Sequence, residues 1–274
     1  MSVLLFICYV LGLWVVLFVA NRRVRYVTKF VIYIVYVSSI ATILLPFSAL
    51  RPCNVRNANV STWMVYWIAP LLGISHEVIG AEHLAEDRAA VVICNHQSLL
   101  DFLGMCKLWP IAGKLAAVAK REILFIWPFG LIAWLSGTVF IDRRHAAESR
   151  DVVNSTERLI KEKGIKLWVF AEGTRSSDGN LLPFKKGGFH LALRGKLPII
   201  PVVMSWYGPF FDSREMRLEP GKVTIKILPA VIVDGTEDVT KLTEKVRADM
   251  QATLESISPD LPPIGSKNGF HASK

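Results

Sequence analysis

The sequence predicts an α/β domain with a largely parallel sheet flanked by helices, preceded by an N-terminal pair of apolar membrane-anchoring helices. Two long runs near the N-terminus carry no charged side chain, and 52% of the 274 residues are hydrophobic. From about Glu77 onward, short β-branched runs alternate with helical patterns. Such alternation is typical of domains with parallel sheets. The length suits one domain with a short anchoring region.

The two uncharged runs are Met1 to Ala20 and Phe30 to Leu50. Each reaches the ~20 residues that a helix needs to cross the hydrocarbon core of a bilayer. A cleaved signal peptide is the alternative for the first run. That run lacks a basic N-terminal part and a small-residue cleavage site, so we expect residues 1–50 to form a membrane anchor.

Residues 51–76 are predicted to connect the anchor to the folded domain. Arg51 to Asn59 is a polar bridge, whereas Trp63 to Leu72 is nearly uncharged and rich in Trp, Tyr, Ile and Leu. This composition favours a helix lying against the membrane interface, with a first core helix as the alternative.

Residues 77–258 are predicted to form the folded domain. Short apolar runs typical of buried strands are Ala89–Cys94, Leu115–Ala119, Ile165–Ala171, Pro198–Met204 and Val223–Leu228. Helical patterns cover Ala146 to Lys163, which Gly164 ends, and Val239 to Ile257, which has one apolar stripe. The polar residues 259–274 are predicted to be a disordered tail.

Ile123 to Ile141 tests this scheme, because its nineteen residues carry no charge and hydropathy alone would make them a membrane span. A span would place Asn95 to Asp101 and Phe170 to Arg175 on opposite sides of the membrane. Since one reaction would need both segments, we expect a buried or membrane-dipping helical segment instead.

The net charge of +9 is consistent with an anionic partner. The sequence has no zinc spacing, basic helix or aromatic-interleaved basic patch, which argues against nucleic acid. Attraction to anionic lipid headgroups or to an anionic substrate fits better. The four cysteines (Cys8, Cys53, Cys94, Cys106) are too scattered for a metal site or a disulfide scaffold. We expect buried free thiols.

The first candidate site is Asn95-His96-Gln97-Ser98-Leu99-Leu100-Asp101, directly after a predicted strand. Histidine accepts a proton near neutral pH, and a carboxylate on its other ring nitrogen stabilises the imidazolium. Residues five apart lie ~140° apart around a helix, so we expect His96 in the strand-to-helix turn and Asp101 in the first turns of the helix. Free backbone N–H groups there would suit an oxyanion. A helix cap beside an ordinary polar residue remains the alternative, and a metal site lacks a nearby third ligand.

The second candidate site is Phe170-Ala171-Glu172-Gly173-Thr174-Arg175-Ser176, where an apolar strand enters a polar turn. An arginine fork matches phosphate oxygens, and a glycine lets backbone amides approach an anion. An ordinary strand-end loop with a surface arginine is the alternative.

Four segments together resemble the ordered motifs of the glycerolipid acyltransferases. They are Asn95-His96-x4-Asp101, Lys120 through Phe140-Ile141-Asp142-Arg143, Phe170-Ala171-Glu172-Gly173-Thr174-Arg175, and Ile200-Pro201-Val202. Within that family the chain is most similar to the 1-acylglycerol-3-phosphate acyltransferases. The family commonly has proline where this chain has Ala171, a departure that affects loop rigidity and no reacting group.

The resemblance implies an acyltransferase domain over residues 77–258, in which His96 is the general base and Asp101 orients it. Glu172, Gly173, Thr174 and Arg175 would hold the glycerol phosphate, and Lys120, Arg143 and Lys185 are expected to help on charge and position only. The reaction would move an acyl group from acyl-CoA, a co-substrate, to the sn-2 hydroxyl of lysophosphatidic acid, in phospholipid and triacylglycerol synthesis. The products would be phosphatidic acid and CoA, and the resemblance implies no cofactor, metal or covalent intermediate.

Three alternatives remain. The acceptor could be glycerol 3-phosphate or another lysophospholipid. The chain could be a non-catalytic membrane protein that binds lipid or CoA, although an intact His96 and Asp101 pair argues against this. A serine hydrolase using Ser98 would lack the usual glycine-flanked nucleophile.

We expect the protein to lie on the endoplasmic reticulum. Its catalytic domain should face the cytosol, because acyl-CoA is made there. The basic residues Arg22 to Lys29 should hold the loop between the anchors in the cytosol, and two full spans would then place the domain in the lumen. A hairpin that dips into one leaflet removes this conflict.

Overall fold

The computed structural model describes residues 3–141, 157–158, 160–176 and 178–262. Its centre is a seven-stranded sheet in the order β1-β9-β6-β2-β5-β3-β4. The strands are β1 (Ile74–Ile79), β2 (Ala90–Cys94), β3 (Leu115–Lys120), β4 (Val139–Ile141), β5 (Lys166–Phe170), β6 (Ile199–Met204) and β9 (Gly221–Ile227). All neighbouring strands are parallel except β6 and β9. The predicted α/β class with a largely parallel sheet is confirmed.

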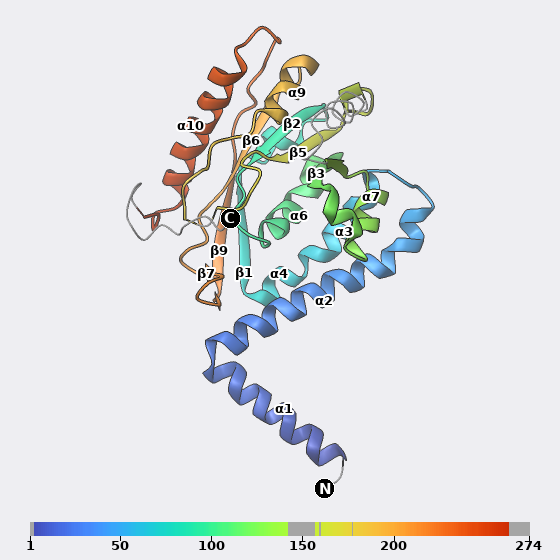
Figure 1. Cartoon of the computed structure of the whole chain (residues 1–274), viewed down its shortest axis with the longest axis vertical. Coiled ribbons are helices and arrows are strands. Elements are labelled where there is room, and N and C mark those ends of the chain that lie inside the picture. Colours follow the sequence, from blue (N-terminus) through green and yellow to red (C-terminus); the bar gives the residue numbers. More distant parts are fainter. Residues whose placement is uncertain (1–2, 142–156, 159, 177, 263–274) are drawn as a thin grey trace.

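Helices cover both faces of the sheet (Figure 1). On one face, α6 (Asp101–Ala112) packs with α2 (Arg22–Ala49), α3 (Arg56–Tyr66) and α4 (Ile68–Leu72) in one apolar cluster. On the other face, α9 (Gly187–Gly195) and α10 (Val239–Ile257) pack in a second cluster. Every residue of β2 and β6 is buried, because both strands lie in the interior of the sheet between these two layers.

The strand register brings the two candidate segments together. Cys94, the last residue of β2, pairs with Phe170, the last residue of β5. Parallel neighbours that end at the same level release their loops side by side at one edge of the sheet. The loops that begin at Asn95 and Ala171 therefore start next to each other.

The five predicted strands are confirmed to within two residues at each end. Two strands of the seven-stranded sheet, β1 and β4, are absent from the prediction. β1 lies at the edge of the sheet and alternates exposed residues with buried or half-buried ones. It includes His76 and Glu77, so it lacks the apolar run that marks an interior strand. A short β7–β8 pair (Phe211–Asp212 and Arg217–Leu218) was also not predicted.

Helix α10 has the predicted bounds, and Asp238 caps its first turn by accepting from the Lys241 N–H. Most of the helix predicted for Ala146 to Lys163 lies outside the described residues. So does the tail after residue 262. Cys94 and Cys106 are buried free thiols as expected, whereas Cys8 and Cys53 are exposed. Cys8 lies in the N-terminal helix α1 (Val3–Ala20), in which no residue is buried.

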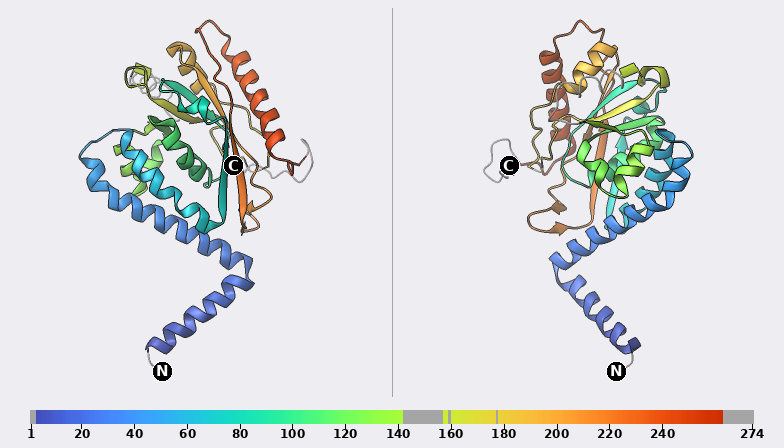
Figure 2. Two further views of the ribbon diagram at one scale, coloured as in Figure 1. Left: turned by 180° about the vertical axis from the view of Figure 1, so that it is seen from behind. Right: turned by 45° about the vertical axis from the view of Figure 1, so that its right-hand side comes forward.

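The N-terminal helices α1 (Val3–Ala20) and α2 are, among the described residues, the two that are long and apolar enough to cross a membrane. No residue of α1 is buried, and the helix extends away from the domain (Figure 2). In contrast, α2 buries a stripe of its own residues against the domain, comprising Tyr33, Val37, Ile40, Ala41 and Ser48. The two predicted anchors therefore differ, because α1 extends away from the domain whereas α2 is part of the fold.

The second anchor begins earlier than predicted. Its helix starts at Arg22, after the cap Asn21, so the basic residues expected in a loop form the first two turns of α2. Arg25 pairs with Glu219 at 3.0 Å, and the Lys29 ammonium donates to the carbonyls of Leu72 and Leu218. These contacts attach the start of α2 to the domain.

The stretch predicted as one helix over Trp63 to Leu72 is divided between α3 and α4. One side packs into the core through residues such as Val65 and Ile68. The other side exposes Trp63 and Trp67, at 56% and 63%. The segment thus packs into the core as the alternative predicted, and the exposed tryptophans leave the membrane-interface role a prediction.

Ile123 to Ile141 is not one helix. It passes through a 3-10 turn η1 (Arg121–Phe125), the short helix α7 (Phe129–Leu135) and strand β4. The helical prediction holds only for α7, because Pro128 precedes that helix and Gly137, at φ 77°, follows it. This segment therefore does not form the membrane-spanning helix that hydropathy alone would assign, in agreement with the rejection of a span above. Phe125 and Trp127 are exposed, while Leu135 is buried.

Candidate active site

The candidate site lies at the carboxyl ends of β2, β5 and β6, where open α/β sheets commonly bind ligands. Loop 95–100 leaves β2 there and leads directly into α6, whose first residue is Asp101. His96 therefore lies in the strand-to-helix turn, and Asp101 lies in the first turn of the helix, as their spacing predicts.

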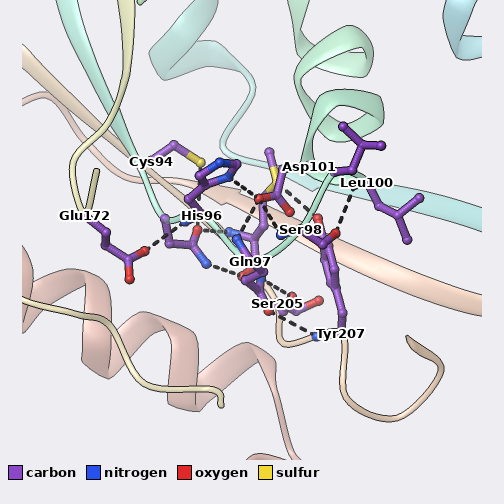
Figure 3. A network of polar contacts seen from close by, with 12 residues as sticks. Cys94, His96, Gln97, Ser98, Leu100, Asp101, Glu172, Ser205 and Tyr207 are labelled. Atoms are coloured by element: carbon purple, nitrogen blue, oxygen red, sulfur yellow. Dashed lines mark hydrogen bonds and ion pairs between the residues drawn. The ribbon is translucent and has the colours of Figure 1, made fainter. Parts of the chain in front are cut away.

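His96 and Asp101 are joined by a hydrogen bond of 2.6 Å between Nδ1 of the imidazole and Oδ2 of the carboxylate (Figure 3). Asp101 is 1% exposed, whereas the side chain of His96 is 20% exposed. Since a carboxylate accepts hydrogen bonds, Nδ1 carries the hydrogen and Nε2 holds the free lone pair. The arrangement can take a proton from a group that approaches the exposed side of the ring.

The same carboxylate oxygen also accepts the backbone N–H groups of Gln97 (2.6 Å) and Ser98 (3.0 Å). The Leu100 N–H donates to the Ser98 hydroxyl at 2.9 Å. The expectation that N–H groups at the start of this helix are free for an oxyanion is therefore wrong for these three donors. Asp101 uses two of them to fix the loop that carries His96.

Phe170 stacks on the imidazole of His96, with ring centroids 4.1 Å apart and an angle of 19° between the planes. The last residue of β5 thus covers one face of the ring. Together with the Asp101 contact at the ring edge, it restricts the rotation of the imidazole.

Glu172 contacts the backbone of the loop that carries His96 and is 3% exposed. One carboxylate oxygen accepts the His96 N–H at 2.8 Å, and the other accepts the Leu182 N–H at 2.9 Å. Burial raises the pKa of Glu172 to about 7, against the opposing effect of these two hydrogen bonds. The structure thus places this predicted substrate ligand with both oxygens turned to the protein backbone.

The remainder of the second segment folds over the same loop. The Ser176 N–H donates to the His96 carbonyl at 2.8 Å, and Gly173 has a φ of 71°, in the region that favours glycine. Thr174 and Arg175 are exposed. The two residues predicted to hold phosphate are therefore exposed, and they directly precede Ser176, which contacts the His96 backbone.

The three basic residues expected to assist are placed differently. The N–H of Lys185 donates to the Ala171 carbonyl at 2.7 Å, so Lys185 adjoins the second segment, and its side chain is exposed. Lys120 is the exposed last residue of β3, which lies two strands from β2. Arg143 lies outside the described residues.

Residues to which the sequence analysis gave no role of their own complete the network in Figure 3. The side chains of Asn95 and Gln97 donate to backbone carbonyls of Met204, at the end of β6, and Ser205, directly after it. Tyr207 lies buried beside Asp101. Burial raises the pKa of the Tyr207 hydroxyl, and the nearby Asp101 carboxylate raises it further. The signal for Asn95 and Gln97 was present as two amides flanking the histidine. Tyr207 is more than a hundred residues from His96 in the sequence, and no local pattern linked it to the site.

Ser98 is not arranged as a nucleophile. Its side chain is buried, and its hydroxyl accepts the Leu100 N–H. Within the described part of the chain, no group of three or more His, Cys, Asp or Glu side chains is placed to hold a metal ion.

The chain was compared with known proteins. A family model described as Acyltransferase matches residues 75–205. The chain is 37% identical over 246 residues to 1-acyl-sn-glycerol-3-phosphate acyltransferase alpha of Bos taurus, which covers 89% of this chain and 85% of that protein. The human protein of the same name matches at 37% over 89% of this chain and 86% of its own.

A solved structure shares the fold. It is that of the 1-acyl-sn-glycerophosphate (LPA) acyltransferase PlsC from Thermotoga maritima, with a TM-score of 0.61 and 25% identity. The likeness covers 84% of this chain and 93% of that chain, so it extends well beyond the residues around His96.

Proposed function

This chain belongs to the glycerolipid acyltransferase family and is similar over most of its length to 1-acyl-sn-glycerol-3-phosphate acyltransferases; from this premise we propose that it acylates the sn-2 hydroxyl of lysophosphatidic acid. The donor is acyl-CoA, and the products are phosphatidic acid and CoA. The observation that carries the proposal is the His96–Asp101 hydrogen bond beside an exposed arginine loop. These two features supply a base and an anion site at the same edge of the sheet.

In the proposed mechanism, Nε2 of His96 takes the proton of the acceptor hydroxyl as the oxygen attacks the thioester carbonyl. Asp101 stabilises the imidazolium that forms. When the carbon–sulfur bond breaks, the CoA thiolate leaves and takes the proton from His96. Atoms and charge balance without a covalent enzyme intermediate, which agrees with the buried position of Ser98.

The lysophosphatidic acid phosphate is proposed to bind the exposed side of the second segment. Arg175 can meet two phosphate oxygens at once, and Thr174 can donate its hydroxyl hydrogen. Gly173, whose own N–H donates to the Phe170 carbonyl at 3.2 Å, permits the turn that presents these two residues. Lys185 adds positive charge next to this segment, with Lys120 as a more distant helper. Arg143 keeps the helper role expected from its charge. Glu172 contributes differently, because both of its oxygens hold backbone N–H groups. We assign it to shaping this segment and not to touching phosphate.

Two apolar helices favour attachment to a membrane. We propose that the membrane is the endoplasmic reticulum and that the domain faces the cytosol. The contacts of α2 support the placement of α2 and the domain on one side of the membrane, because Arg25 and Lys29 bind the domain at the start of the helix and Ser48 is buried near its end. This arrangement differs from the expected hairpin, in which α2 would dip into the leaflet together with α1. A helix attached along its length to the domain stays on the side of the domain, whereas α1 is free to enter lipid.

The test of the proposed function is an acceptor panel with the purified full chain and one labelled acyl-CoA. The panel contains lysophosphatidic acid, glycerol 3-phosphate, lysophosphatidylcholine and monoacylglycerol. We expect the highest kcat/KM with lysophosphatidic acid, and phosphatidic acid as the labelled product. A higher value with any of the other three would reassign the acceptor. Absence of transfer to all four would overturn the proposed function.

A further inference from the structure

The residues on either side of His96 are buried carboxamides. Asn95 is 1% exposed and Gln97 is 9% exposed. Both reach the segment Met204–Tyr207, which begins at the last residue of β6. Neither can act in proton transfer, because a carboxamide does not titrate near neutral pH, so their burial beside the base needs another explanation.

Asn95 extends the pairing between β2 and β6 with its side chain. The last backbone pair in this ladder is Cys94 with Val202. Beyond it, the Asn95 amide donates to the Met204 carbonyl at 3.0 Å and accepts the Met204 N–H at 2.9 Å. Because the side chain satisfies the strand, the backbone is free to turn out of the sheet, and the next residue, His96, projects into the site.

Gln97 fixes the other side of His96. Its amide donates to the carbonyls of Met204 (3.1 Å) and Ser205 (2.9 Å) and accepts the Tyr207 N–H at 3.2 Å. Its backbone N–H donates to Asp101 (Figure 3). Gln97 therefore connects the carboxylate that orients His96 to the chain after β6.

We propose that Asn95 and Gln97 are positioning residues, which hold His96 and Asp101 in hydrogen-bonding geometry by fastening their loop to residues 204–207. Five side-chain hydrogen bonds carry this fastening. The opposite side of the loop is held by Glu172 and Ser176. The role rests on the proposed function, since it serves the base assigned there. Neutral amides suit it because they hold the loop without placing another charge beside Asp101.

The test uses Asn95→Asp and Gln97→Met in the full chain. Asn95→Asp keeps the acceptor for the Met204 N–H and loses the donor. Gln97→Met keeps about the same side-chain volume and loses the three hydrogen bonds of the Gln97 amide. The matched control is Asn57→Asp, because the Asn57 amide likewise holds backbone carbonyls, those of Ser48, Arg51 and Leu135, but lies outside the site. The fraction of folded protein is measured by thermal unfolding for each variant.

Two readouts separate positioning from general stability. First, kcat per folded enzyme should fall about 10- to 100-fold in Asn95→Asp and Gln97→Met, with KM for lysophosphatidic acid and acyl-CoA little changed. Asn57→Asp should keep the wild-type kcat. Second, the Nδ1 proton shared with Asp101 should give a far-downfield proton NMR resonance, assigned by its loss in His96→Ala. This resonance should weaken or disappear in the two site variants and persist in the control.

Wild-type kcat in the site variants, an equal loss in Asn57→Asp, or an unchanged resonance would overturn the proposal. Because the resonance needs no substrate, it decides the positioning role even if the acceptor panel overturns the proposed function. If neither variant folds, hydrogen exchange on the wild type decides. The backbone N–H groups of Met204 and Tyr207 should then exchange as slowly as the sheet core, and rapid exchange at both would contradict the fastening.

Discussion

The carboxylate of Glu172 accepts the backbone N–H of His96 across 2.8 Å, which joins two segments seventy-six residues apart in the sequence. The acid therefore acts on the backbone of the proposed base, while Asp101 acts on its ring. Since the other Glu172 oxygen holds the Leu182 N–H, a single buried side chain fastens the loop after β2 to the connection between β5 and α9 and braces that connection internally.

The pH dependence of stability should reveal Glu172. Its pKa is raised from the ordinary value of 4.5 to about 7, so the folded state keeps a proton that the unfolded chain has lost. Stability should then fall as pH rises from 4.5 to 7, by roughly 3 kcal/mol from this group at most. The free energy of unfolding in detergent, measured across this range, should show a smaller decrease in Glu172→Gln. Parallel curves for the two proteins would remove Glu172 as the source.

Replacement of the proposed base should stop transfer without unfolding the protein. We expect His96→Ala to lower kcat by at least about 10²- to 10⁴-fold, the usual contribution of a positioned base. His190→Ala, at an exposed position on α9, is the control and should keep wild-type turnover. Radiolabelled acyl transfer and the thermal midpoint are measured on all proteins. Wild-type turnover in His96→Ala would refute the mechanism.

Asp101→Asn tests the partner of the base. The variant retains an oxygen that can accept the Gln97 and Ser98 N–H groups, so the loop should stay folded. It no longer stabilises an imidazolium, and kcat should fall by roughly 10²- to 10⁴-fold with little change in KM. A rise in KM alone would indicate that Asp101 serves substrate binding instead.

Arg175→Ala should act on the substrate phosphate. The loss of a charge-assisted hydrogen bond predicts a decrease in kcat/KM of roughly 10- to 100-fold with lysophosphatidic acid. The relative loss should be smaller with monoacylglycerol, which has no phosphate. Arg194→Ala, on the last turn of α9, provides a control for the change in net charge. Equal losses on both acceptors would exclude a phosphate role for Arg175.

Membrane sidedness can be read from two sequons, Asn59-Val60-Ser61 and Asn154-Ser155-Thr156. A cytosolic domain leaves both without glycan. The direct measurement is labelling of a cysteine engineered at Asp178 by an impermeant reagent in sealed microsomes, in a background without the exposed Cys8 and Cys53. We expect labelling from the cytosolic side without detergent. Glycan on Asn154, or labelling only after permeabilisation, would place the domain in the lumen.

The His96–Asp101 geometry followed from the sequence because the spacing is local. Two residues five apart cannot meet on one regular helix, so a turn had to precede Asp101, and it does. The orientation of Glu172 did not follow, because it depends on the register that pairs Cys94 with Phe170. A strand shifted by one residue would point the next side chain to the other face of the sheet. Nothing within the second segment itself specifies that register.

The start of α2 shows the same limit at longer range. Arg25 and Lys29 looked like the boundary of a membrane segment, because charged side chains are costly in lipid. In the structure, their charges are compensated by Glu219 and by the carbonyls of Leu72 and Leu218, up to 194 residues away. Such partners are supplied by the tertiary fold, so a local pattern of charge cannot predict them.

The attachment of α2 to the domain also determines how the proposed enzyme would meet its lipid substrate. Tyr33 of α2 is buried and approaches the Leu99 carbonyl at 3.5 Å, three residues after His96 in the chain. On a membrane, a rigid connection of this kind would hold the site at a constant height above the acyl chains. The lipid would then arrive by diffusing sideways within its own leaflet, a search in two dimensions, while the water-soluble donor would approach from the opposite direction.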